Sequence, residues 1–258
     1  MAELRNYQTR AAPAARGDAA IDEGLRAYMI RVYNLMALGL VITGAAALGT
    51  VMLATTGDPA AAVAQLPNGK MLTSFGTAIY GSPLRWVVML APLALVFFLG
   101  FRINKMSVQA AQTTFWIYAG LVGVSLSSIF LVYTSGSIVQ TFFIAATAFG
   151  ALSLWGYTTK RDLTGMGSFM IMGLFGLIIA MLVNIFLQSS ALQFAISGIG
   201  VLVFAGLTAY DTQKIKEMYY EGDGAVVMGR KAIMGALNLY LDFLNLFLFM
   251  LQFFGNRE

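Results

Sequence analysis

The sequence predicts an all-α integral membrane protein with seven transmembrane helices, and three observations support this class. Of its 258 residues, 59% are hydrophobic and only 11% are charged, which is far less charge than the surface of a soluble fold requires. Several uncharged runs are longer than the ~20 residues that one spanning helix needs. These runs are continuously apolar, whereas the strands of a membrane β-barrel alternate between apolar and polar residues.

The N-terminal part of the chain divides into a polar tail and a first membrane helix. Residues 1–25 are rich in Ala and polar residues with scattered Arg, a composition that builds no core, so we expect a mobile basic tail. No charge interrupts the stretch from Val32 to Thr56. Because this stretch is too long for the apolar region of a signal peptide, we predict an uncleaved helix that opens a single membrane domain over residues 26–258.

Turn signals and charges set the bounds of the other helices. Residues 57–83 contain three Gly- and Pro-rich turn signals, which predict a loop. A short apolar run then ends at Arg102. The uncharged run from Met106 to Thr159 is long enough for two helices, and the run over 163–210 is long enough for two more. The predicted helices cover about 30–55, 84–102, 107–133, 138–158, 166–188, 191–219 and 229–255.

The Lys and Arg residues predict the orientation of the helices. If the N-terminus is cytoplasmic, 13 of the 16 basic residues fall on cytoplasmic segments. Lys70, Arg85 and Arg257 fall on the opposite side. This bias follows the positive-inside rule and predicts a cytoplasmic N-terminus. It also explains the net charge of +4 through contact with the lipid bilayer, so we expect no nucleic-acid partner.

The chain contains no Cys and no His. Disulfides and thiolate metal sites are therefore excluded, as are catalytic dyads and pH switches that depend on imidazole. We expect no cofactor. Any proton chemistry must rest on carboxyl groups, with help from Arg, Lys or Tyr.

The apolar run from Ala232 to Phe254 carries Asp242 near its middle. An ionised side chain at mid-bilayer costs at least about 2.5 to 3.5 kcal/mol, so such residues usually face the interior of a helix bundle. Asn238, Asp242 and Asn245 recur at spacings of four and three and share one stripe of the helix. We therefore predict that this last helix is central in the bundle.

Asp211 and Asp242 form a candidate pair. They lie equally far from the middle of the connection between the last two antiparallel helices, so they should face each other at similar depth. At about 4 Å and an effective dielectric of about 20, two carboxylates repel each other by roughly 4 kcal/mol, which favours sharing one proton. Arg102 is the nearest candidate counter-charge, and the segment from Lys214 to Glu221 is typical of a solvated helix end.

Four segments carry a resemblance to a known family. They are Ala209-Tyr-Asp-Thr-Gln-Lys-Ile-Lys216, Leu239-Tyr-Leu-Asp-Phe-Leu-Asn-Leu-Phe247, Phe149-Gly-Ala-Leu-Ser-Leu-Trp-Gly-Tyr157 and Thr159-Lys-Arg-Asp162. Over roughly residues 25–255 the chain resembles the Bax inhibitor-1 family, especially its bacterial branch. The resemblance implies a seven-helix bundle with the last helix in the middle, a pH-sensitive calcium leak and a location in the bacterial inner membrane. It also implies that Asp211 and Asp242 match the family's paired aspartates and that Arg102 matches the Arg that latches onto them.

The function favoured by the sequence is a gated leak for calcium or another cation, and not an enzyme. Asp211 and Asp242 would be weak, transient metal ligands, because two carboxylates fall short of the 6 to 8 oxygens of a dedicated calcium site. The supporting polar residues are Asn238, Asn245, Tyr210 and Tyr240.

Two alternatives stay open. The same two aspartates suit an intramembrane aspartyl protease, since a carboxyl pair with one shared proton is a general acid and base. Residues 239–242, however, read Leu-Tyr-Leu-Asp, where such proteases have Gly-x-Gly-Asp. The other alternative is a regulator that transports nothing and binds partner membrane proteins through an unknown surface.

Overall fold

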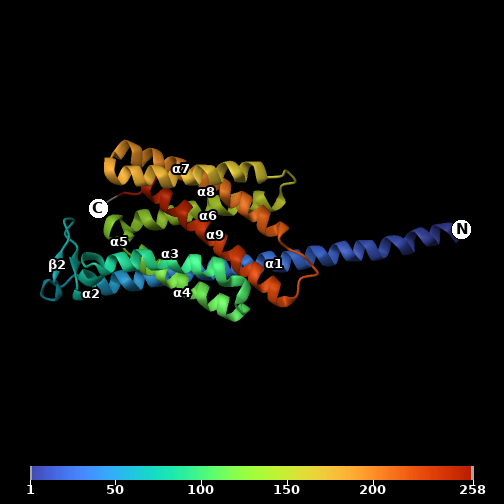
Figure 1. Ribbon diagram of the computed structural model, residues 1–258, viewed down its shortest axis with the longest axis horizontal. Helices are drawn as coiled ribbons and strands as arrows, with labels where there is room; N and C mark the ends of the chain where they lie inside the picture. The colour runs from blue at the N-terminus through green and yellow to red at the C-terminus, as the bar shows by residue number, and fades with distance from the viewer. Residues whose placement is uncertain (1, 257–258) are drawn as a thin grey trace.

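The computed structural model describes residues 2–256, and the side chains of residues 23–256. Within this part, seven helices are long and apolar enough to cross a membrane, which confirms the predicted class. They are α1 (Ala2–Ala54), α3 (Leu84–Arg102), α4 (Val108–Leu126), α6 (Ser135–Thr158), α7 (Thr164–Leu187), α8 (Ser190–Glu217) and α9 (Ala225–Phe254). Figure 1 shows them as a bundle that α9 crosses obliquely and from which the N-terminal end of α1 projects.

The start of α1 and the end of α4 differ most from the predicted bounds, while α6 and α9 begin three and four residues earlier than predicted. Helix α1 begins at Ala2, well before position 30, because Ala, Arg and Glu are strong helix formers and continue the helix backwards. The mobility expected of residues 1–25 stays a prediction, since the side chains of residues 1–22 lie outside the described part. Helix α4 ends at Leu126 and is followed by the single turn α5 (Ile129–Val132). The Ser127 hydroxyl bonds the Val124 carbonyl at 2.6 Å and so competes with the helical hydrogen bonds there.

The predicted loop over residues 57–83 contributes two strands to a small sheet that the turn signals did not reveal, and the third strand directly precedes the loop. Its antiparallel strands are very short and lie in the order β1-β3-β2. Lys70 Nζ donates to the Phe130 carbonyl at 2.6 Å, and Asn68 Nδ2 donates to the Leu131 carbonyl at 2.8 Å. These bonds tie the loop to α5. The short elements are β1 (Thr55–Thr56), η1 (Pro59–Ala61), β2 (Ala64–Gln65), β3 (Met71–Leu72), α2 (Ser74–Gly76), η2 (Thr77–Gly81) and η3 (Ile103–Lys105).

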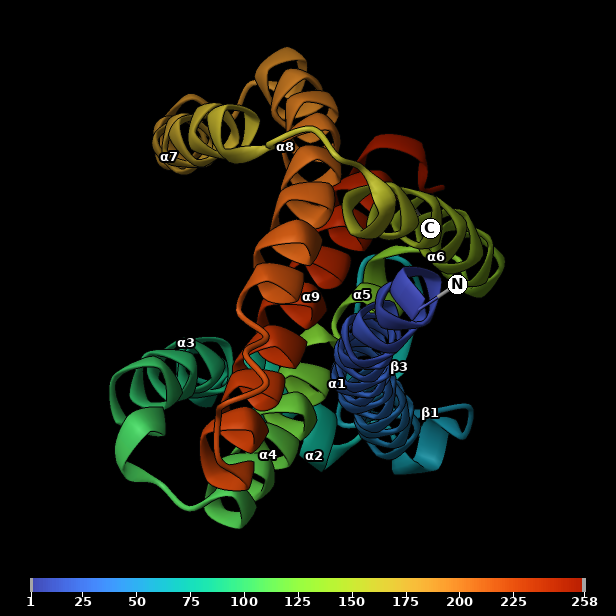
Figure 2. The ribbon, with the colours of Figure 1, turned by 90° about the vertical axis from the view of Figure 1, so that its right-hand side faces the viewer.

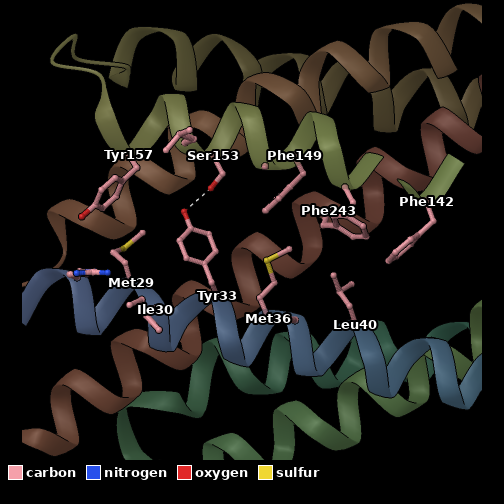
Figure 3. Close-up of a pocket in the computed structure, with 15 residues that line it drawn as sticks. Met29, Ile30, Tyr33, Met36, Leu40, Phe142, Phe149, Ser153, Tyr157 and Phe243 are labelled. Carbon is pink, nitrogen blue, oxygen red and sulfur yellow. Dashed lines mark hydrogen bonds between the residues drawn. The ribbon is translucent and has the colours of Figure 1, made fainter. Parts of the chain in front are cut away.

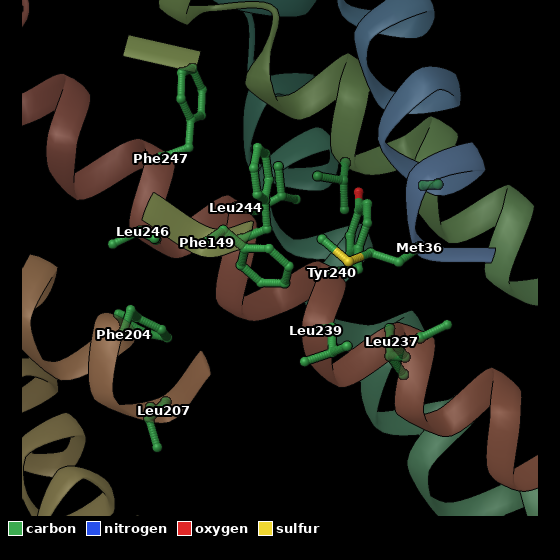
Figure 4. Close-up of a cluster of buried hydrophobic side chains, with 14 of the residues drawn as sticks. Met36, Phe149, Phe204, Leu207, Leu237, Leu239, Tyr240, Leu244, Leu246 and Phe247 are labelled. Atoms are coloured by element: carbon green, nitrogen blue, oxygen red, sulfur yellow. The ribbon is translucent and has the colours of Figure 1, made fainter. Parts of the chain in front are cut away.

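Helix α9 lies at the centre of the bundle, as the sequence predicts. Within its most apolar window 72% of the residues are buried, against 11% for α3 and 6% for α7. It packs against α1, α4, α6 and α8, and Figure 2 shows it running between them while α7 lies outside α8. Leu239 and Leu246 of α9 are fully buried within the apolar cluster of Figure 4. The cytoplasmic side of the bundle stays a prediction.

Helices α6 and α8 approach each other at a glycine. A Cβ atom added to Gly156 would overlap the carbonyl oxygen of Ala209, whereas one added to Gly150 of the same helix would meet no atom within 4 Å. Backbone atoms yield less readily than the far end of a side chain, so a larger residue at position 156 must push the two helices apart.

Gly156→Ala is therefore expected to lower the free energy of unfolding by about 1–3 kcal/mol, the usual effect of overpacking. Gly150→Ala is the matched control and should leave stability unchanged or raise it, because Ala favours helix more than Gly does. Thermal unfolding of the purified proteins in one detergent measures both effects. Equal melting temperatures for the two variants would contradict the close approach.

Candidate functional site

The last two helices form the hairpin that the sequence predicts, and its connection is held by Lys231. Lys231 Nζ donates to Asp223 Oδ2 at 2.5 Å and to the Met218 carbonyl at 2.8 Å. Both acceptors lie at or after the end of α8, whereas Lys231 belongs to the second turn of α9. The pairing fixes the register of the hairpin, so residues that are equally far from the connection face each other.

Asp211 of α8 and Asp242 of α9 line one cavity of about 640 Å³ between α7, α8 and α9. We call this cavity the acidic groove. Its apolar lining comes from all three helices, while its polar lining residues are Tyr210, Asp211, Lys214, Asn238, Asp242, Asn245 and Gln252. The two carboxyl groups are close enough to influence each other electrostatically. The prediction that the two acids meet thus agrees with the geometry.

Asp242 is the more enclosed of the two acids. Its side chain is 5% exposed, and among the described residues its Oδ2 atom is buried without a hydrogen-bond partner. Leaving a charged oxygen buried and unpaired is costly. The Asp242 carboxyl group therefore depends on what the groove holds beside it: Asp211, a proton or a cation.

The structure does not bring Arg102 to the acid pair. Arg102 is exposed at the end of α3, with its guanidinium carbon 5.9 Å from the centroid of the Phe98 ring, and it is absent from the residues that line the acidic groove. The reason is the position of α3, which packs mainly against α4. The described arrangement thus differs from the latch that the resemblance implies.

Lys214 supplies the positive charge that lines the acidic groove. It interacts with Asp211, and its Nζ lies 5.7 Å from the centroid of the Tyr210 ring. The interpretation of Lys214 as part of a solvated helix end is therefore incomplete. The sequence could have placed Lys214 beside Asp211, because the two lie three residues apart and such residues share a helix face.

The supporting polar residues separate into two groups. Tyr210, Asn238 and Asn245 line the acidic groove with the pair. Tyr240 does not, and its assignment to the site is wrong. It is fully buried on the other side of α9, where its hydroxyl is hydrogen-bonded to Thr43 Oγ1 at 2.6 Å; Figure 4 shows the Tyr240 ring directed towards α1. The two-residue spacing from Asp242 turns Tyr240 by about 200° around the helix.

Tyr240→Phe is expected to lower the free energy of unfolding by about 1 kcal/mol, the usual contribution of one hydrogen bond, without altering any pH-dependent property of the acid pair. Thermal unfolding measures the first effect, and cation flux across a range of pH tests the second. Tyr220→Phe, at an exposed position of the connection, is the control for stability. A changed pH response in Tyr240→Phe would return this residue to the site.

The donor set of the acidic groove suits passing cations better than a resident metal. Among the described residues, no group of three or more His, Cys, Asp or Glu side chains is arranged to hold an ion. Two carboxyl groups and the amide oxygens of Asn238 and Asn245 are oxygen donors of the kind that hard cations prefer. Such a set can bind a calcium ion weakly while the ion keeps part of its water.

These features define a multi-pass helical membrane protein whose central helix and its neighbour share an acid pair, in which Asp242 is buried and Asp211 is half-buried. A sequence model described as "Inhibitor of apoptosis-promoting Bax1" matches residues 25–258. The chain belongs to this family, the Bax inhibitor-1 family, which confirms the resemblance.

Similar proteins occur in several bacteria. The chain is 52% identical over 237 residues to a protein of Rickettsia prowazekii, covering 92% of each chain. It is 46% identical over 260 residues to a protein of Caulobacter vibrioides, covering 100% of each. It is 44% identical over 237 residues to the inner membrane protein YbhL of Escherichia coli, covering 91% of this chain and 94% of that one. With its seven apolar helices, the protein is a multi-pass protein of the inner membrane.

Proposed function

We propose that this protein is a pH-sensitive leak pathway for calcium or a similar cation. The observation that carries the proposal is the enclosed Asp242 carboxyl group, whose Oδ2 atom lacks a hydrogen-bond partner among the described residues, in one groove with Asp211. A purely structural acid in a membrane helix would be expected to have both oxygens satisfied. An unsatisfied oxygen beside a second acid suits a group that exchanges protons and cations.

The acid pair supplies both the sensor and the transient binding site. When the pair holds one proton, the two carboxyl groups can stay close together. When that proton leaves, repulsion of roughly 4 kcal/mol at about 4 Å drives the two groups apart, and the ionised oxygens become ligands for a cation. The positive charge of Lys214 offsets part of this repulsion, because it stabilises the ionised form of a nearby carboxyl group.

The latch role of Arg102 requires an arrangement other than the described one. Helix α3 would have to move towards α9 before the Arg102 guanidinium could reach the acid pair. The guanidinium would then also have to turn away from the Phe98 ring of its own helix. In the described arrangement we assign the role of counter-charge to Lys214. We propose the Arg102 contact as a property of a second state of the bundle.

Calcium flux into liposomes tests the function directly. The full chain is reconstituted into vesicles that hold a calcium-sensitive dye, and flux is measured from pH 5 to pH 8. We expect flux above that of protein-free vesicles, with a clear dependence on pH. Flux equal to that of empty vesicles at every pH would contradict the proposal.

The surroundings of Asp242 argue against an intramembrane aspartyl protease. Leu239 and Tyr240, which precede Asp242, are both fully buried in the bundle and do not line the acidic groove. A substrate peptide in the groove would therefore meet Asn238 and Leu241 but not the two residues between them. Cleavage of a transmembrane reporter peptide, lost on replacing either Asp by Asn, would favour the protease.

A further inference from the structure

A second groove lies between α1 and α6 and shares no lining residue with the acidic groove. Its volume is about 670 Å³, within the range of ~300–1,000 Å³ that is typical of ligand pockets. Residues of α1 and α6 form its walls, and Phe243 of α9 lies at its base, as Figure 3 shows. We call it the α1–α6 groove.

The α1–α6 groove is long. On α1 it extends from Arg26 to Leu40, which is roughly 21 Å at ~1.5 Å per residue. One leaflet of the hydrocarbon core is about 15 Å deep, so the groove reaches from the headgroup level through a whole leaflet. An acyl chain of the bilayer, which spans one leaflet, can therefore lie along the groove.

The long middle part of the α1–α6 groove is suited to hydrocarbon. Most of its lining residues are aliphatic, aromatic or Met. The Tyr33 hydroxyl is hydrogen-bonded to Ser153 Oγ at 2.6 Å (Figure 3), and Ser153 Oγ is hydrogen-bonded to Thr212 Oγ1 at 2.9 Å. These hydroxyl groups satisfy one another, so an acyl chain beside them leaves no polar group without a partner.

One end of the α1–α6 groove is basic. At this end the exposed Arg26 lines the groove from α1, and Tyr157 lines it from α6. Lys216 Nζ donates to the Tyr157 carbonyl at 2.8 Å and lies 5.3 Å from the centroid of the Tyr157 ring. Lys160 and Arg161 follow directly after the end of α6. Basic pockets between membrane helices attract anionic headgroups, and Tyr is enriched at the membrane interface.

We propose that the α1–α6 groove binds one anionic phospholipid of the surrounding bilayer. One acyl chain lies along the trough between α1 and α6, and the phosphate group lies against Arg26. The length of the trough, its apolar lining and the charge at one end all match this ligand. The proposal does not depend on cation leak, because the two grooves are lined by different residues.

Native mass spectrometry of the detergent-purified full chain tests the headgroup preference. The probes are phosphatidylglycerol and phosphatidylethanolamine with identical acyl chains. We expect a several-fold preference for phosphatidylglycerol, which Arg26→Gln removes. Arg31→Gln is the matched control, since Arg31 is also an exposed Arg of α1 but does not line the groove. Equal binding of both lipids to the unaltered protein, or an equal loss in Arg31→Gln, would overturn the proposal.

Filling the trough tests the place of the acyl chain. A Cβ added at Gly150 meets no atom within 4 Å, so Gly150→Leu should fold while its side chain occupies the groove. We expect it to lose most of the bound phosphatidylglycerol. Gly136→Leu is the control, because Gly136 lies in the same helix with equally open space but outside the groove. Unchanged lipid binding in Gly150→Leu would show that the lipid binds elsewhere.

Discussion

Asp242→Asn is expected to abolish the pH dependence of calcium flux. The amide has the size of the carboxylic acid but cannot lose a proton, so the pair can no longer change from one shared proton to none. A repulsion of roughly 4 kcal/mol corresponds to about three pH units of coupling, so its loss should be plain between pH 5 and pH 8. Flux measured in liposomes should become nearly constant over that range.

Asp223→Asn is the matched control for this experiment. Asp223 is also a carboxylate of the α8–α9 hairpin, but it pairs with Lys231 in the connection and does not line the acidic groove. Its replacement should lower stability modestly and leave the pH response intact. If Asp242→Asn and the unaltered protein responded alike to pH, the acid pair would have no part in gating.

Lys214→Gln is expected to raise the pH at which flux is half-changed. The positive charge of Lys214 acts on Asp211, and its removal makes the ionised state of the pair harder to reach. The same liposome measurement gives this midpoint directly.

Arg102→Gln separates the two candidate counter-charges. Because Arg102 lies over Phe98 and away from the acidic groove, its replacement should leave the midpoint unchanged as long as the described arrangement dominates. A shift equal to that of Lys214→Gln would show that a state with Arg102 at the acid pair is well populated. No shift in either variant would remove both residues from control of the pair.

Much of the fold follows from the sequence because a bilayer allows few solutions. Apolar runs of spanning length must be helices, and a helix with Asp242 near its middle must face its neighbours and not lipid. The symmetry of an antiparallel hairpin then brings Asp211 and Asp242 to one depth. These steps need only helical geometry and the cost of burying charge, which explains why they agree with the structure.

The remaining features depend on how separate helices pack, which spacing within one helix does not reveal. Arg102 was placed near the acids by its depth and by the family resemblance, but α3 packs against α4 and carries it elsewhere. Lys214 was attributed to solvent, although its spacing from Asp211 puts both on one face. Tyr240 was assigned to the site despite a spacing that turns it to the opposite face. The small sheet after α1 forms from strands of two residues each, too short for any periodic signal.

The position of α7 bears on how the acid pair is enclosed. This helix packs mainly against α8, and only 6% of its most apolar window is buried. It nevertheless provides one wall of the acidic groove. A displacement of α7 would admit water to Asp211 and Asp242 while α9 and its other neighbours stayed packed, so the hydration of the two acids depends on the contact between a single pair of helices.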